Sequence, residues 1–351
     1  MLARTASKAR PLVIITANAQ HAERLREEIS WFDPKLSVHL LPDWETLPYD
    51  NFSPHPDLIS ERLATLHYFS QQSCDVAIVP ISTALTRLPP REYLSAHTFF
   101  LKQGQRLDIP ALRAQLTLGG YAHTSQVVSP GEYAVRGGVI DLFPMGSAVP
   151  YRLDLMGDDI DTLRTFDVDT QRSIYPVKEI RLLPAREFPL DEAGQSRFRE
   201  NFRDKFEGDP SKSRLYKDVS NGLAPAGIEY YLPLFFEHTA TLVDYLPPSS
   251  TLCMHHDVMG AAQEFWREAL SRYQLLRGDP DRPLLSPVEI FLPAEAFFAT
   301  IKPFARIEIA APTNALPSSG MVSLPKLEVN RRSAQPISQL IDFIDIFVSI
   351  K

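Results

Sequence analysis

Buried strands and amphipathic helices alternate along the first hundred residues. Residues 12–16 (LVIIT) and 75–79 (DVAIV) are apolar runs with the length of a fully buried strand, and 37–41 is a third strand candidate. Asn18 is placed to cap a helix after the first strand. Apolar residues recur at helical spacing in both intervening segments: Ala22, Leu25, Ile29 and Phe32, then Ile59, Leu63 and Leu66. This alternation predicts a parallel sheet covered by helices.

Residues 131–169 carry the period-two pattern of consecutive strands instead. Residues 139–143 form an apolar run, and apolar side chains then alternate with polar ones in 151–156. Gly157-Asp158-Asp159 supplies a hairpin turn before a return strand containing Ile160, Leu163 and Phe166. We expect a small antiparallel or mixed sheet, closed by 177–183, with Arg136 and Arg152 at polar positions.

The remaining pattern adds elements on both sides of that small sheet. A helix is expected over 109–118, ended by Gly119-Gly120. After the sheet, phenylalanines at 198, 202 and 206 mark another helix, and a further helix begins at Val258. Residues 241–245, 251–255 and 306–310 are strand candidates, and we expect them to complete the first sheet.

Composition is that of an ordinary globular protein, with 44% hydrophobic and 23% charged residues. The formal net charge of −7 argues against a surface that binds nucleic acid over its whole extent. No apolar run is long enough to cross a membrane and no signal peptide is recognisable, so a cytoplasmic location is expected. Cys74 and Cys253 are expected to be buried free thiols.

Several motifs occur in one order between residues 131 and 169: GEYxxRG, then FP, then YRxD, then GDxID. This order resembles the second domain of the UvrB-like family of bacterial nucleotide excision repair, which includes UvrB and the transcription-repair coupling factors. The resemblance implies an α/β fold: a helicase-like parallel-sheet domain made of two sequence segments, with an inserted small mixed α/β domain. The expected divisions are 1–97, the inserted domain 98–184, 185–320, and a linker with the start of a truncated domain at 321–351.

Two segments favour the coupling-factor branch of this family. The loop of residues 42–56 lacks the long tyrosine-rich insertion of UvrB, and the segment PAGIEYYLPLFF (225–236) is similar to the coupling factors. In structural terms, Trp44 and Tyr49 are expected to be packing anchors, and 225–236 is expected to be an aromatic core segment.

The sequence carries no Gly-Lys pair and therefore no P-loop, and DVAIV lacks paired acidic residues for magnesium. The resemblance then implies a non-catalytic adaptor that recruits UvrA in transcription-coupled repair. ATP, magnesium, RNA polymerase and double-stranded DNA would be bound only by parts of a longer protein. The alternative is a UvrB-type ATP-dependent enzyme that binds damaged DNA.

The resemblance assigns UvrA contact to Arg136 and Arg152, with Met156 at a position where an aromatic residue is expected in close relatives. Arginine suits such a contact because its planar guanidinium pairs with carboxylates through two hydrogen bonds.

No metal site is expected. His255 and His256 are adjacent, and neighbouring residues on a strand point to opposite faces. The acidic residues at 158, 159, 161, 167 and 169 lack the glycine and the third ligand of a calcium loop, which favours a solvated hairpin end.

Overall fold

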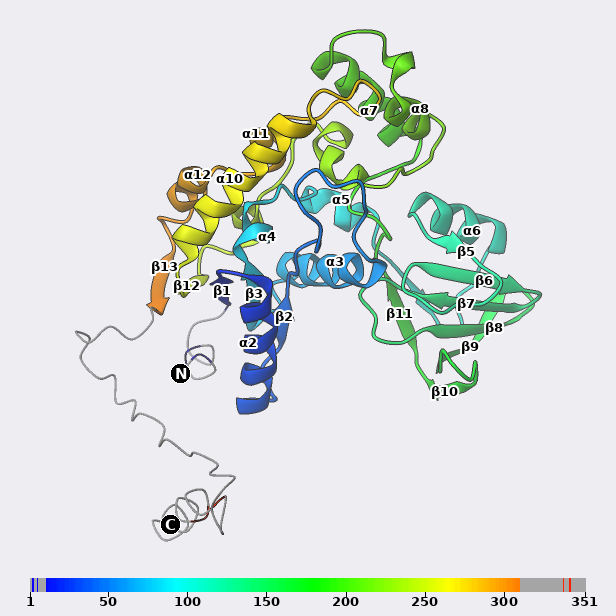
Figure 1. Cartoon of the computed structure of the whole chain (residues 1–351). Coiled ribbons are helices and arrows are strands. Elements are labelled where there is room, and N and C mark those ends of the chain that lie inside the picture. The colour runs from blue at the N-terminus through cyan, green and yellow to red at the C-terminus, as the bar shows by residue number, and fades with distance from the viewer. Residues whose placement is uncertain (1, 3–4, 6–10, 310–336, 338–340, 342–351) are drawn as a thin grey trace. The chain divides into compact units, whose positions relative to one another are not determined.

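The computed structural model describes residues 2, 5, 11–309, 337 and 341. Its first sheet has five parallel strands in the order β13-β12-β1-β3-β2 (Figure 1). The strands are β1 (Leu12–Thr16), β2 (Val38–Leu40), β3 (Val76–Pro80), β12 (Thr251–His255) and β13 (Ala305–Ile309). The sheet thus draws strands from two distant segments, which confirms the predicted fold class.

Helices cover both faces of this sheet. Successive side chains of a strand point to opposite sides, so a strand that is apolar throughout presents an apolar surface on each face. Leu12 and Ile14 of β1 share a core with Ala22, Leu25 and Ile29 of α2 (Ala19–Phe32). Val13 and Ile15 belong to the larger core on the other face. That core includes residues of α3 (Pro56–Ser70), α4 (Ile81–Leu85), α5 (Arg91–Ala96), α10 (Val258–Leu276) and α12 (Ala294–Thr300).

A second sheet of six strands lies between the two segments in sequence, in the order β10-β9-β8-β7-β6-β5. Neighbouring strands are antiparallel except for the parallel pair β5 and β6. The strands are β5 (Ala122–His123), β6 (Glu132–Arg136), β7 (Val139–Phe143), β8 (Tyr151–Met156), β9 (Asp159–Phe166) and β10 (Ser173–Pro176). Helix α6 (Ile109–Leu118) buries Leu112 and Leu116 and ends at Gly119, as predicted.

The expectation that residues 177–183 close this sheet is wrong. Strand β11 (Glu179–Leu182) pairs with β4 (Phe99–Lys102) in a separate two-stranded antiparallel sheet. β10 takes the edge beside β9 instead. The β4–β11 pair brings the two ends of the inserted segment together.

The segment after the insertion is helical and rich in buried aromatic residues. It contains α7 (Glu192–Lys205), the 3₁₀ helices η1 (Pro210–Lys212) and η2 (Ile228–Phe235), α8 (Arg214–Ser220), α9 (Leu242–Tyr245) and α11 (Pro287–Ile290). Residues 241–245, predicted as a strand, form helix α9. Thr241 and Asp244 cap that helix reciprocally, and this local exchange of hydrogen bonds favours a helical turn.

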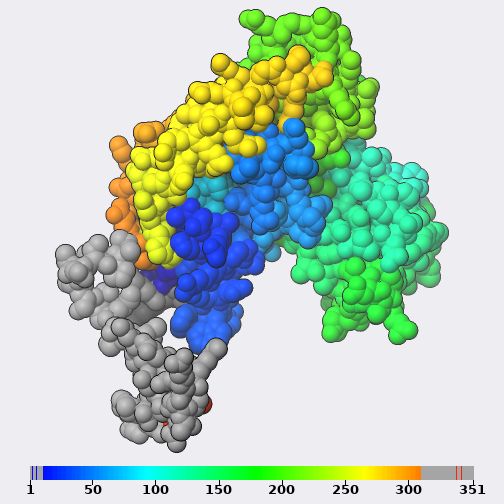
Figure 2. All heavy atoms as spheres, in the orientation of Figure 1, coloured from blue at the N-terminus to red at the C-terminus, as the bar shows by residue number. Residues whose placement is uncertain are grey.

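The loop before α3 packs on this aromatic segment. The rings of Trp44 and Tyr49 lie 5.3 and 5.9 Å from the ring of Tyr230, so both are packing anchors as expected. Arg272 of α10 donates to the carbonyl of Pro48 over 2.6 Å. Figure 2 shows the corresponding contact between the blue loop and the yellow helix.

Residues 311–351 form a unit separate from 1–310. The linker and the start of a truncated domain, predicted for 321–351, lie outside the described residues, apart from Ile337 and Ile341. Within the described parts of the chain, no helix is both long and apolar enough to span a bilayer.

Candidate partner-binding site

Arg136 and Arg152 lie on the outer face of the six-stranded sheet, one strand apart. Arg136 ends β6 and Arg152 is the second residue of β8. Between them, on β7, Asp141 is directly opposite Arg152 and is paired on its other side with Ala134. Side chains two residues apart on a strand share a face, so Arg136 follows Ala134 onto the same side of the sheet.

The carboxylate of Asp141 joins the two arginines. Arg152 donates to it twice, from Nε to Oδ1 over 2.6 Å and from Nη2 to Oδ2 over 2.9 Å. Arg136 donates from Nη2 to the same Oδ2. We refer to Arg136, Asp141 and Arg152 as the arginine–carboxylate cluster. It holds two positive charges and one negative charge.

The two arginines differ in exposure. The side chain of Arg152 is 18% exposed and that of Arg136 is 49% exposed, whereas the carboxylate of Asp141 is fully buried. Arg152 also donates to the carbonyl of Gln171 over 3.0 Å, and its guanidinium carbon lies 5.0 Å from the centre of the Phe166 ring. Its hydrogen bonds to Asp141 are the main reason that its pKa is raised. Arg152 is therefore the more constrained of the two arginines, and Arg136 is the more exposed.

Met156 ends β8 and is 74% exposed. It is opposite Asp159 across the hairpin whose turn contains Gly157, a residue with φ of 67°. The turn between β6 and β7, with Gly137 at φ of 60°, lies at the same end of the sheet, because Leu155 donates to the carbonyl of Gly138 over 2.8 Å. An exposed, flexible thioether at this end of the sheet suits contact with a partner surface.

Sequence reasoning missed two residues of this face. Asp141 lies within the apolar run 139–143, and a carboxylate inside a buried strand signals that a cation must lie nearby. Arg164 of β9 is directly opposite Arg152 and exposed, and alternation along the return strand could have placed it on the outer face. Asp154 on the same strand as Arg152 accepts a 2.6 Å hydrogen bond from Thr162.

The predicted solvated hairpin end fits the structure, whereas the argument about His255 and His256 does not. Asp158, Asp159, Asp161 and Asp169 are exposed, whereas Asp167, which follows β9, is partly buried. His255 is the last residue of β12, but His256 lies beyond the strand with φ of 67°. Strand alternation therefore does not separate the two side chains, and their ring centres are 4.3 Å apart.

Comparison with known proteins places this site in a described family. The UvrB interaction domain family matches residues 99–188, which contain the arginine–carboxylate cluster and Met156. Over 342 residues, 96% of the chain, the sequence is 43% identical to the transcription-repair-coupling factor of Escherichia coli. It is 41% identical over 345 residues to that of Haemophilus influenzae and 26% identical over 259 residues to that of Bacillus subtilis.

The match covers only part of these relatives. The chain spans 30% of the length of the Escherichia coli and Haemophilus influenzae proteins and 22% of the Bacillus subtilis protein.

Proposed function

Since the chain belongs to the transcription-repair-coupling factor family and contains a UvrB interaction domain, we propose that it is an adaptor module that recruits UvrA in transcription-coupled nucleotide excision repair. The observation that carries this proposal is the match of the UvrB interaction domain to the segment that presents Arg136 and Met156 on its surface. We infer a cytoplasmic location from the same repair role.

The exposed residues of the outer face would make the contact. Arg136 has one guanidinium nitrogen bound to Asp141 and half of its side chain exposed. That arrangement fixes the direction of the side chain while leaving donors for a carboxylate of the partner. Met156 adds apolar area, and Arg164 adds positive charge opposite Arg152. We propose Arg152 as a positioning residue because three of its N–H donors are used within the chain, two by Asp141 and one by the carbonyl of Gln171.

The adaptor would be non-catalytic. The sequence has no P-loop, and the family match covers an interaction domain. ATP and magnesium would belong to other parts of the longer relatives, as would contacts with RNA polymerase and double-stranded DNA. We propose no cofactor for the UvrA contact itself.

The test is a titration of purified UvrA against the chain and its Arg136→Glu variant. If Arg136 is a central contact, reversal of its charge weakens binding by about 30-fold or more, equivalent to about 2 kcal/mol. Met156→Asp tests the apolar part of the contact and is expected to weaken binding in the same direction.

The matched control is Arg197→Glu, an exposed arginine of α7 outside the UvrB interaction domain. It applies the same charge change and should leave the affinity for UvrA unchanged. If the parent chain does not bind UvrA, the adaptor function is wrong. If Arg136→Glu and Arg197→Glu bind equally well, the adaptor binds through another surface.

A further inference from the structure

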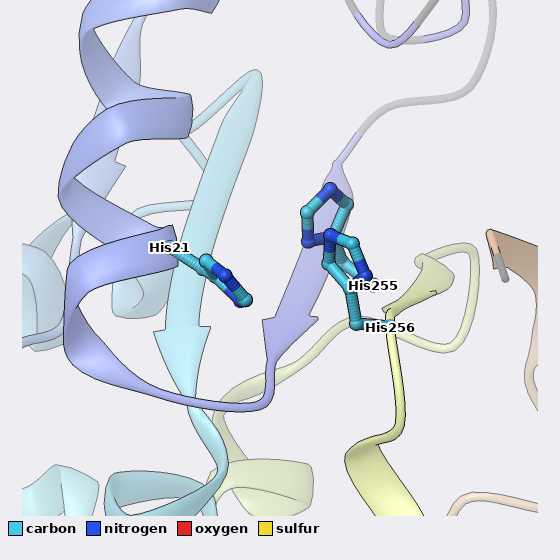
Figure 3. A group of neighbouring side chains, drawn as sticks. All are labelled: His21, His255 and His256. Atoms are coloured by element: carbon cyan, nitrogen blue, oxygen red, sulfur yellow. The ribbon is translucent and has the colours of Figure 1, made fainter. Parts of the chain in front are cut away.

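Three histidines from distant parts of the sequence meet at one end of the parallel sheet. His21 comes from the first turn of α2, and His255 and His256 come from the end of β12. Figure 3 shows the His21 side chain directed from its helix toward the other two. We refer to these three residues as the histidine cluster.

The backbone around each residue explains why they meet. Asn18 accepts a 2.9 Å hydrogen bond from the backbone N–H of His21 and so caps α2 directly after β1. His255 is paired with Thr16, the last residue of β1. At His256 the chain leaves the strand with φ of 67°, and its N–H donates to the carbonyl of Ile309 over 2.9 Å. The left-handed conformation turns the His256 ring back toward the other two.

The ring geometry suits a shared ligand. One ring nitrogen from each histidine lies within 4.8 Å of the others. The rings of His21 and His256 are stacked with centres 4.7 Å apart, whereas those of His21 and His255 are 5.9 Å apart and nearly perpendicular. Among the described residues, this is the one group of His, Cys, Asp and Glu side chains close enough together to hold a metal ion.

Two ring nitrogens of the cluster are unsatisfied by protein groups. The Nδ1 atoms of His21 and His255 are buried and have no hydrogen-bond partner within the described structure. A buried polar atom without a partner is unfavourable by about 1–3 kcal/mol, so such atoms point to a missing ligand, ion or water.

The position in the fold is also a favoured place for ligands. The chain leaves β1 through α2, which covers one face of the sheet, and leaves β12 through α10, which belongs to the core of the other face. β1 and β12 are adjacent, so the chain connections that follow these two strands go to opposite faces of the sheet. In open parallel sheets, ligands bind outside the carboxyl ends of strands at such a divergence.

We propose that His21, His255 and His256 bind one divalent transition-metal ion, with Zn²⁺ as the ion that fits best. Three neutral imidazoles with a water as fourth ligand form a common zinc environment. Zinc–nitrogen bonds of about 2.0–2.1 Å in a tetrahedral site put the nitrogens roughly 3.3 Å apart, so binding draws the rings together. This site is independent of the proposed UvrA contact, whose residues lie within 99–188.

The test is Zn²⁺ binding by the untagged, chelator-treated full chain, measured by calorimetry. Co²⁺ absorption provides a second readout because tetrahedral coordination gives strong visible bands. We expect one ion per chain with micromolar affinity. His21→Asn and His256→Asn are each expected to weaken binding at least tenfold. Asparagine tolerates the left-handed backbone of residue 256, so the second variant preserves the local fold.

His238→Asn is the matched control, since His238 is exposed and lies outside the cluster. It should bind Zn²⁺ like the parent. The proposal is overturned if the parent binds no Zn²⁺ when the Zn²⁺ concentration is about 100-fold above the expected micromolar dissociation constant. It is also overturned if His256→Asn and His238→Asn bind Zn²⁺ equally well. In the first outcome the histidines are a packing cluster only, and in the second the ion binds elsewhere.

Discussion

The buried carboxylate of Asp141 gives the two arginines of the outer face different roles. Arg152 uses the carboxylate as a bidentate partner and stacks near Phe166, whereas Arg136 touches it with one nitrogen and stays half exposed. Reversing the charge of Arg152 would place two carboxylates together inside the sheet. If an Arg152→Glu variant lost UvrA binding, the loss could therefore come from unfolding or from the missing contact. Arg136→Glu separates these two causes better because Arg136 is more exposed.

Replacing Asp141 tests this division. Asp141→Asn removes the negative charge between two guanidinium groups and weakens their hydrogen bonds. We expect the free energy of unfolding to fall by about 1–3 kcal/mol, a range that allows for the solvent exposure of Arg136. Urea denaturation followed by circular dichroism measures it. Asp154→Asn, on the same face but hydrogen-bonded to Thr162, is the control and should lose less stability. Equal losses would contradict the central role of Asp141.

Glu229 predicts a pH dependence of stability. Burial raises its pKa to about 7, from an ordinary value near 4.5. The folded state therefore holds this proton more tightly than the unfolded state, and the resulting stability is lost as pH rises from about 4.5 through 7. Replacing the carboxyl with the neutral amide in Glu229→Gln removes this loss. As the pH rises from 4 to 8, the free energy of unfolding of the variant should increase by roughly 3 kcal/mol relative to that of the parent.

The measurement is the free energy of unfolding of both proteins across that pH range. Glu295→Gln is a suitable control because Glu295 is exposed. Parallel stability curves for the parent and Glu229→Gln would contradict the raised pKa.

At the scale of secondary-structure elements, a buried ion pair connects the first segment with the residues that follow the insertion. Arg62 of α3 donates to Glu187 over 2.6 and 3.3 Å, and to the carbonyl of Pro42 over 2.6 Å. Both charged side chains are 1% exposed. Removing one partner leaves the other charge buried, so Glu187→Gln should destabilise the chain by about 3 kcal/mol.

The double variant Arg62→Met, Glu187→Leu separates charge from packing. It removes both charges while keeping much of the volume, and we expect it to be more stable than Glu187→Gln alone. Thermal or urea unfolding of the three proteins gives the comparison. A double variant less stable than the single one would show that the ion pair contributes net stability.

Element prediction succeeded where burial and local periodicity agreed. Residues 12–16 and 251–255 are apolar, short and central in the sheet, and both are strands as predicted. The strand predicted over residues 241–245 is wrong. The reciprocal capping of Thr241 and Asp244 stabilises a helical turn there and outweighs the strand propensity of this short run. For 177–183 the strand itself was right, but its pairing with β4 depends on a contact distant in sequence. The histidine cluster was missed for the same reason, since His21 joins His255 only through the pairing of β1 with β12.

At the scale of the whole molecule, the motif order over residues 131–169 indicated the family, while the contacts within the candidate site required the structure. The family resemblance identified Arg136 and Arg152 as candidate site residues. The strand register was needed to show that Asp141 lies between them and binds both. The UvrB interaction domain family matches residues 99–188, the segment to which we assign the proposed partner contact.

This organisation predicts competition between the chain and UvrB for UvrA. If the UvrB interaction domain presents the surface that UvrB presents, one UvrA site cannot hold both proteins, and added chain should displace labelled UvrB as its concentration rises. Fluorescence anisotropy of UvrB bound to UvrA measures the displacement. Arg136→Glu should need about 30-fold more protein for half displacement, and Arg197→Glu should match the parent. A ternary complex of UvrA, UvrB and the chain, with UvrB affinity unchanged, would contradict a shared site, because occupancy of one surface by one partner must reduce binding of the other.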